Sequence, residues 1–255
     1  MTKMPVLFVG HGSPMNVIEN NRFTESWKAV AADLPRPKAV LCVSAHWFDR
    51  GLAVTGTENP ETIHDFWGFP PELYEINYPA PGDPELARSL AGAFGGHLRV
   101  DRHRGLDHGA WSVLSFMYPE ADVPVCQLSV DASFTPRQSY LAGQSLTPLR
   151  EEGVLILGSG DVVHNLALAD WDMSYGYDWA DEFDNYIKEA VLKGRFEAAV
   201  DYAKAGPAAA RAVPMRDHFD PLLYVLGAAD GGEPVSVFNE ARIMGSLSMT
   251  SFQIG

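Results

Sequence analysis

Three histidines follow closely on apolar runs that are rich in β-branched residues. His11 lies in VLFVGHGSP, His46 in AVLCVSAHW and His164 in VLILGSGDVVHNL. In open α/β sheets ligands bind beyond the carboxyl ends of the strands, so we expect these three imidazoles to converge on one site. Imidazole suits zinc, iron, copper and nickel, and it exchanges protons near neutral pH. The pattern therefore indicates a metal centre, an acid/base site, or both.

The other histidines divide into candidate site residues and surface residues. His218 in MRDHFDPLLYVLG and His108 in LDHGAW each lie at the start of a probable helix, and either could supply a fourth or fifth imidazole. His64 in TIHDFWGFP is a candidate for a substrate pocket. His97 and His103 flank a probable edge strand, HLRVDRH, so we expect them to be solvated.

Other catalytic chemistries find little support in the sequence. It contains no HExxH motif, no paired CxxC motif and no EF-hand pattern. Ser13 of GHGSP is not in a GxSxG nucleophile elbow, because Pro14 follows it. Cys42 and Cys126 both lie inside apolar runs, where a free cysteine behaves as a small buried hydrophobic residue.

The elements that must position the histidines alternate along the chain. Strands are predicted at Val6–Val9, Ala39–Val43, Val123–Val130, Val154–Leu157, Val235–Phe238 and Ser246–Ile254. Helices are predicted at Glu19–Asp33, Pro84–Phe94, Pro136–Glu152, Trp179–Ala205 and Pro221–Ala229. Alternation of this kind predicts a mainly parallel or mixed sheet covered by helices on both faces, a three-layer α/β/α fold. We expect one catalytic domain over residues 1–255.

The segment of residues 58–84 is predicted to be a long loop rich in proline and aromatic residues. Loops of this length inside a compact domain are usually lids or binding loops. Phe66 and Trp67 could stack on a planar ring, and with His64 and Ser13 they are the expected substrate-pocket residues. The alternative is a hydrophobic flap packed on the core.

Charge and hydropathy limit the partners. The formal net charge of −14 argues against a nucleic-acid backbone and favours a small-molecule partner. Arg102, Arg104 and Arg216 are the candidate partners for a substrate carboxylate. The apolar runs are too short to span a bilayer and no secretory signal is recognisable, so we expect a cytoplasmic protein that does not bind membranes, as a monomer or small homo-oligomer.

Several motifs together resemble one enzyme family. The chain resembles the extradiol aromatic-ring-opening dioxygenases of the DOPA dioxygenase type, relatives of the catalytic subunit of protocatechuate 4,5-dioxygenase. The resemblance rests on GHGSPMN, SAHWF, TIHDFWGFP, YPAPG, LDHGAW, GSGDVVHNL, PLLYVLGA and GSLSMTSFQIG. It implies a three-layer α/β fold with one divalent metal, iron(II) or zinc(II). It also implies cleavage of a DOPA-like or related catechol by O2 to a ring-opened semialdehyde.

The resemblance also assigns roles to individual histidines. It makes His11, His46 and His218 metal ligands and places His164 at or beside the metal, where the acid/base histidine of the family lies. His108 would face the substrate and share the acid/base work with His164.

Two alternatives to a dioxygenase remain at this point. Non-haem iron dioxygenases typically use two histidines and one carboxylate, whereas the third-ligand position here holds His218. An all-histidine set also suits zinc, which would fit a zinc-dependent hydrolase or lyase. The other alternative is a non-catalytic superfamily member that binds a protein partner.

Overall fold

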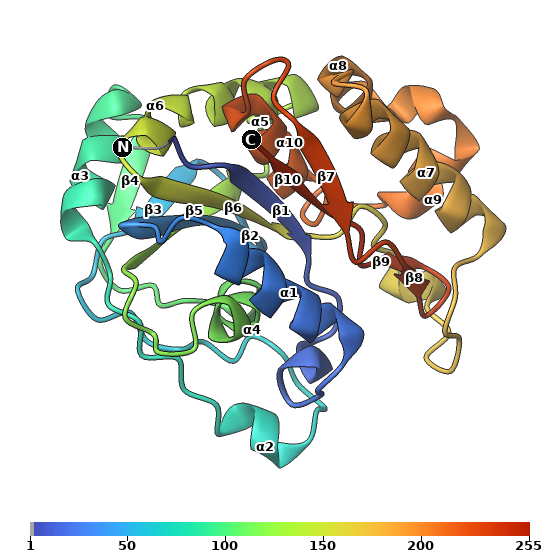
Figure 1. Cartoon of the computed structure of the whole chain (residues 1–255), viewed down its shortest axis with the longest axis horizontal. Coiled ribbons are helices and arrows are strands. Elements are labelled where there is room, and N and C mark those ends of the chain that lie inside the picture. Colours follow the sequence, from blue (N-terminus) through green and yellow to red (C-terminus); the bar gives the residue numbers. More distant parts are fainter. Residues whose placement is uncertain (1–2) are drawn as a thin grey trace.

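The structure is a computed structural model that describes residues 3–255, and strands and helices alternate along it (Figure 1). Its strands are β1 (Val6–Gly10), β2 (Ala39–Asp49), β3 (Leu52–Thr55), β4 (Leu98–Asp101), β5 (Val125–Asp131), β6 (Val154–Gly160), β7 (Val235–Phe238), β8 (Arg242–Ile243), β9 (Leu247–Ser248) and β10 (Ser251–Ile254). Its α-helices are α1 (Arg22–Asp33), α2 (Pro71–Tyr74), α3 (Pro84–Ala93), α4 (His108–Met117), α5 (Pro136–Gln144), α6 (Thr147–Glu151), α7 (Asp178–Leu192), α8 (Phe196–Val200), α9 (Pro207–Ala212) and α10 (Asp220–Ala228). Short 3-10 helices are η1 (Pro14–Val17), η2 (Leu166–Leu168) and η3 (Tyr202–Ala205).

Eight of the strands described within residues 3–255 form one mixed sheet in the order β4-β3-β5-β2-β6-β1-β10-β7. The central strands β5, β2, β6 and β1 are parallel to one another. The strand β10 pairs antiparallel with β1 and β7, and β3 pairs antiparallel with β5. This confirms the predicted mainly parallel or mixed sheet.

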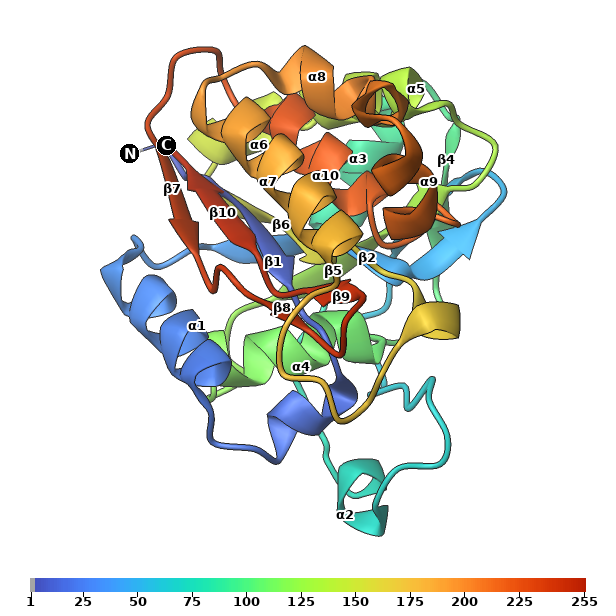
Figure 2. The ribbon, with the colours of Figure 1, turned by 90° about the vertical axis from the view of Figure 1, so that its right-hand side faces the viewer.

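Both faces of the sheet are buried, as the near-continuous apolar strands predict. In β1, Val6 and Phe8 belong to one core cluster, whereas Leu7 and Val9 belong to the cluster on the opposite face. Helices α5 to α10 lie over the first face, and α1 and α4 lie over the second (Figures 1 and 2). The three-layer α/β/α architecture is therefore confirmed.

Two predicted helices are interrupted in the structure. The predicted helix Pro136–Glu152 ends as α5 at Gln144, and α6 begins at Thr147. Pro148 accounts for the break, because it has no N–H to donate to the carbonyl of Gln144 four residues earlier, where α5 ends. The predicted helix Trp179–Ala205 is divided after α7, where Gly194 adopts a φ of 64° that ends a helix.

The other differences between the predicted and the observed elements concern short strands and helices. The strand β3 and the helix α9 were not predicted, and the predicted strand at 246–254 is divided into β9 and β10. The predicted edge strand is β4, and His97 and His103 beside it are both exposed, as expected.

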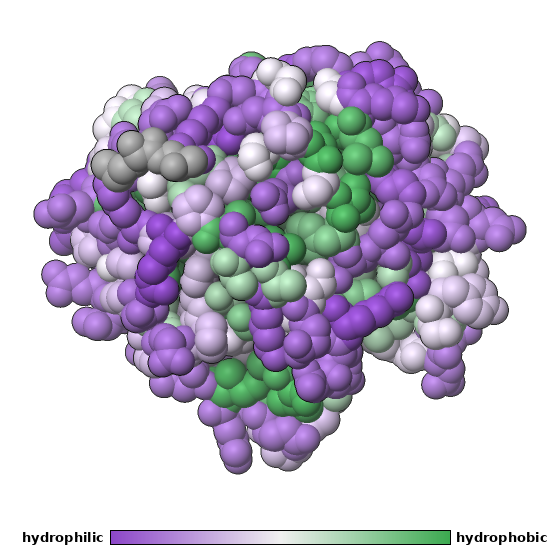
Figure 3. Space-filling model, viewed as in Figure 1, coloured by the Kyte–Doolittle hydropathy of each residue, from purple (hydrophilic) through white to green (hydrophobic). Residues whose placement is uncertain are grey.

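The visible surface is mostly hydrophilic, and both cysteines are buried, as their apolar sequence surroundings predict. The face seen in Figure 3 is mostly hydrophilic, with only small hydrophobic clusters. Cys42 and Cys126 are free thiols buried on opposite faces of the sheet. Among the helices described in residues 3–255, none has the length and hydropathy to cross a bilayer.

Candidate metal centre

The carboxyl ends of β1 and β6 bring His11 and His218 together. The two strands are parallel with Gly10 opposite Gly160, and the His11 amide donates to the Gly160 carbonyl at 3.1 Å. The His218 carbonyl accepts from the Asp161 amide at 3.0 Å. A Cβ atom at Gly160 would lie 2.1 Å from that carbonyl oxygen, so only glycine allows this approach.

Three histidines form a compact set of nitrogen donors. The ring centroids of His11, His46 and His218 lie 5.0 to 5.3 Å apart, and one nitrogen from each ring lies within 4.8 Å of the others. The Nε2 atoms of His11 and His46 are 3.1 Å apart. Two metal–nitrogen bonds of about 2.0–2.1 Å can span that separation.

The hydrogen-bond network assigns tautomers to two of these rings. Ser159 Oγ donates to the Gly109 carbonyl at 2.5 Å, so it accepts the Nδ1 proton of His11 at 2.9 Å. His46 Nδ1 faces Asp65 Oδ2 at 3.3 Å, which favours a proton on that nitrogen too. In the neutral rings the Nε2 lone pairs then face each other, an arrangement that a bound cation stabilises. The residues present therefore fit a divalent metal.

Burial keeps the donor imidazoles neutral. It is the main reason that the pKa values of His11 and His218 lie well below 6.5, and the neighbouring histidines lower them further. For His46, burial and then the charge of His108 lower the pKa to about 3. Neutral imidazoles keep the lone pair that binds a metal.

An unpaired carboxylate oxygen also points toward the donor set. Asp161 is fully buried and its Oδ1 accepts from the Gly12 amide at 3.1 Å. Its Oδ2 has no hydrogen-bond partner among the residues described, and it lies 4.0 Å from His11 Nε2. Burial raises the pKa of Asp161 well above its ordinary value. A cation at the donor set would oppose this effect and favour the carboxylate.

His164 lies beside the donor set rather than within it. Its amide donates to the Ala212 carbonyl at 2.9 Å, and its ring stacks on His218 with centroids 3.4 Å apart and an interplanar angle of 6°. Together with Asp161 and His218 it forms a second group of donors within 4.8 Å. Burial lowers the pKa of His164 to about 4. The stack places two neutral rings in the wall of the cavity.

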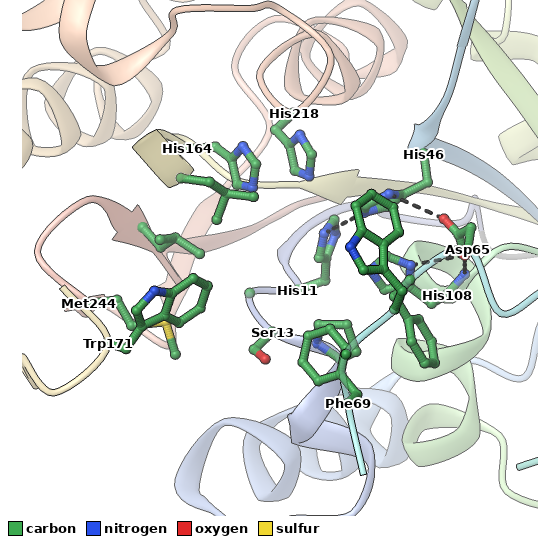
Figure 4. Close-up of a pocket in the computed structure, with 17 residues that line it drawn as sticks. His11, Ser13, His46, Asp65, Phe69, His108, His164, Trp171, His218 and Met244 are labelled. Carbon is green, nitrogen blue, oxygen red and sulfur yellow. Dashed lines mark hydrogen bonds and ion pairs between the residues drawn. The ribbon is translucent and has the colours of Figure 1, made fainter. Parts of the chain in front are cut away.

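Asp65 connects His108 to the donor set, as the dashed lines in Figure 4 show. Its Oδ1 accepts from the His108 amide at 2.9 Å and from His108 Nδ1 at 3.0 Å, while its Oδ2 faces His46. Burial raises the pKa of Asp65, but the hydrogen bond and charge of His108 outweigh that effect and set it at about 2. The carboxylate thus fixes the Nδ1 proton of His108 and leaves Nε2 as the free nitrogen.

A cavity of about 630 Å³ opens beside these histidines. Three of the expected pocket residues, Ser13, Phe66 and Trp67, line it. His64, also expected there, does not, because its Nε2 bonds to the Ile76 carbonyl at 3.0 Å and its ring packs edge-on against Phe66. Phe66 is also largely buried, so the loop of residues 58–84 is partly packed on the core and partly a cavity wall.

The expected arginine partners for a substrate carboxylate are engaged elsewhere. Arg104 donates to the His46 carbonyl and to Asp107, each at 3.1 Å. Arg216 donates to Asp220 at 2.8 Å, and Arg102 is exposed outside the cavity lining. None of the three lines the cavity, so the structure lends no support to their candidacy as partners of a substrate carboxylate.

Sequence reasoning also missed residues that the structure places at the site. Asp65 follows His64 directly, and Asp161 stands between GSG and His164, so both lie inside motifs already chosen for other residues. Trp171 and Met244 line the cavity from segments that carry no recognisable motif.

A mixed α/β sheet whose strand ends hold a histidine cluster beside an aromatic cavity fits the ring-opening oxidoreductases of the extradiol dioxygenase class. The chain belongs to the family of the catalytic LigB subunit of aromatic ring-opening dioxygenase, which matches residues 4–250. The family predicted from the motifs is thereby confirmed.

Named relatives match over the full length. The chain is 47% identical to the 4,5-DOPA dioxygenase extradiol of Escherichia coli K12, over 100% of this chain and 96% of that protein. It is 39% identical to the Beta vulgaris protein of the same name, over 96% and 94% of the two chains. It also superimposes on the crystal structure of an uncharacterized protein from Escherichia coli K12 with a TM-score of 0.86, at 42% identity, covering 99% and 100% of the two chains.

Proposed function

We propose that this chain is a single metal-dependent catalytic domain that opens the ring of a catechol with O2 and releases a semialdehyde. The observation that carries the proposal is the convergence of nitrogens from His11, His46 and His218 within 4.8 Å of one another at the wall of the cavity. Family membership supports the reaction class, and the relatives called 4,5-DOPA dioxygenase support a catechol substrate.

His11, His46 and His218 would hold the metal. When bound, iron(II) supplies Lewis acidity that lowers the pKa of the catechol hydroxyls and the redox chemistry that O2 requires. The protein contributes a fixed set of neutral donors, because Ser159 and Asp65 hold the Nδ1 protons of His11 and His46.

Two further histidines would move protons. His108 has its Nδ1 proton fixed on Asp65, so its Nε2 would accept a proton from a catechol hydroxyl. His164, neutral and stacked on His218, would be the second candidate to hold that same proton and return it to the departing oxygen. The aromatic walls formed by Phe66 and Phe69 would hold the ring and exclude water.

A zinc-dependent hydrolase or lyase is the second candidate. The specific observation in its favour is that the donor group of His11, His46 and His218 contains three imidazoles and no carboxylate, a set that zinc accepts readily.

Reconstitution distinguishes the two candidates. Protein loaded anaerobically with iron(II) is given a catechol and then O2, and oxygen uptake is recorded together with the absorbance of the ring-opened product. We expect one O2 consumed per catechol with iron(II) and none with zinc(II). The variant His103→Ala, which changes an exposed histidine away from the cavity, is the control. No oxygen uptake from iron-loaded protein with any catechol would refute the proposal.

A further inference from the structure

Asp161 is a buried carboxylate without a cationic side chain as its partner. It is 0% exposed, and no lysine or arginine within residues 3–255 lies close enough to form an ion pair with it. The Gly12 amide donates to Oδ1 at 3.1 Å, whereas Oδ2 accepts no hydrogen bond from the residues described. A carboxylate buried without a counter-charge is strongly destabilising, so a cation is expected beside the unpaired oxygen.

The chain fixes this carboxylate between two of the candidate metal ligands. The Asp161 amide donates to the His218 carbonyl at 3.0 Å, which connects its backbone to one ligand. Its side chain is held by the amide of Gly12, the residue that follows His11. The segments that place the two histidines therefore also set the orientation of the carboxylate.

The unpaired oxygen lies within reach of a metal shared with these histidines. Asp161 Oδ2 is 4.0 Å from His11 Nε2, and two bonds of about 2.0–2.2 Å, one to each atom, can span that separation. A carboxylate oxygen of Asp161 also lies within 4.8 Å of a ring nitrogen of His218. The histidines line the cavity and Asp161 does not. The carboxylate would therefore approach the metal from the protein side and leave the cavity side open for substrate and O2.

The charge of the centre gives a second reason for a carboxylate ligand. Three neutral imidazoles leave both positive charges of a divalent ion uncompensated in a buried site. Asp65 cannot supply this ligand without breaking its contacts, because its two oxygens face His108 and His46. One carboxylate would halve the net charge, and mixed sets of histidine and carboxylate are those that non-haem iron(II) commonly uses.

We propose that the carboxylate of Asp161 is a further ligand of the metal that His11, His46 and His218 would hold. The inference rests on the metal centre of the proposed function and adds to it a residue that lies behind the cavity wall. The complete donor set then consists of three imidazoles and one carboxylate.

Zinc(II) binding tests this assignment without turnover. Asp161→Asn keeps an oxygen that can accept from the Gly12 amide, but it places an uncharged amide group at the position of Oδ2. We expect it to bind zinc(II) about 10–100-fold more weakly than wild type in titration calorimetry with a competing chelator. Asp131→Asn is the matched control, because Asp131 is 4% exposed, accepts from the Gly51 amide at 3.1 Å and does not line the cavity. Wild-type zinc affinity in Asp161→Asn would overturn the assignment, and so would an equal loss of affinity in Asp131→Asn.

A crystal structure of the zinc-loaded wild-type protein tests the assignment even if the variant fails to fold. We expect zinc with Asp161 Oδ2 at about 2.0–2.2 Å and one nitrogen from each of His11, His46 and His218. A distance of more than about 3 Å from zinc to Oδ2 would overturn the assignment. Absence of zinc from the histidines would overturn it together with the proposed metal centre. Neither measurement uses O2 or a catechol, so failure of the oxygen-uptake experiment alone would contradict only the proposed function.

Discussion

Replacing Asp65 by asparagine should disturb two histidines at once. The carboxylate accepts two hydrogen bonds from His108 on one oxygen and faces His46 Nδ1 with the other. Asparagine has a single acceptor oxygen, so if it keeps the bonds to His108, its amide group must face His46 Nδ1. His46 would then move its proton to Nε2, the nitrogen that lies 3.1 Å from His11 Nε2 in the donor set.

The size of this effect follows from the geometry and from known metal sites. The pKa of Asp65 is about 2 instead of 3.8, so its surroundings favour the carboxylate by about 2 kcal/mol. Loss of a carboxylate that orients a metal ligand typically costs about 10–100-fold in metal affinity or activity. We therefore expect Asp65→Asn to bind zinc(II) about 10–100-fold more weakly.

Competition with a chromophoric chelator measures that affinity directly. The spectroscopic readout is the ¹⁵N shift of His46 in metal-free protein, which should report a change from the Nδ1-protonated to the Nε2-protonated tautomer. Glu61→Gln, an exposed carboxylate in the same loop, is the matched control and should leave both measurements unchanged. Wild-type zinc affinity together with an unchanged tautomer in Asp65→Asn would refute this reasoning.

Three further predictions concern the division of work among the histidines and the stability of the fold. His218→Ala should lose metal, seen by metal analysis after dialysis, because a donor is removed; metal content equal to wild type would contradict its role. His108→Ala and His164→Ala should retain metal and turn over about 10²–10⁴-fold more slowly in the oxygen-uptake assay, and full activity would contradict their proton-transfer roles. Glu233→Gln should destabilise the fold by about 2–4 kcal/mol in denaturant unfolding at neutral pH, because it breaks a two-bond pair with Arg150, whose side chain is 1% exposed. Burial raises the pKa of Glu233, but hydrogen bonds led by that of Arg150 lower it to about 2. The difference in unfolding free energy between wild type and Glu233→Gln should therefore be full above about pH 5 and shrink as the pH falls toward 2. A difference that does not depend on pH would count against this explanation.

The sequence was most informative where one physical rule dominates. The buried parallel strands were predictable because continuous apolar runs such as that of β6 have few other uses in a soluble fold. The convergence of His11, His46 and His164 followed from topology, since parallel strands end at one edge of the sheet. His218, in a turn before α10, was predicted from its position only as a possible further imidazole, and its assignment as a metal ligand came from the family resemblance.

Irregular segments limited the prediction of the site. In the loop of residues 58–84 no periodicity indicates which of two neighbours faces inward, so His64 was chosen where Asp65 is the residue that contacts the histidines. Arg104 and Arg216 were considered as partners of a substrate carboxylate because a sequence does not show which arginines already pair with a carboxylate of the protein. The first case depends on a loop without regular structure, whereas each arginine pairs with a carboxylate only three or four residues further along the chain.

The candidate donors are dispersed along the chain, and this has a thermodynamic consequence. His11, His46 and His218 come from segments more than 30 residues apart, so no part of the unfolded chain can present the three nitrogens together. A metal that binds only the folded form stabilises it by mass action, by about 2.7 kcal/mol at a concentration one hundred times its dissociation constant. The melting temperature of the whole domain should therefore rise with the concentration of free metal, which makes thermal unfolding a measure of metal affinity.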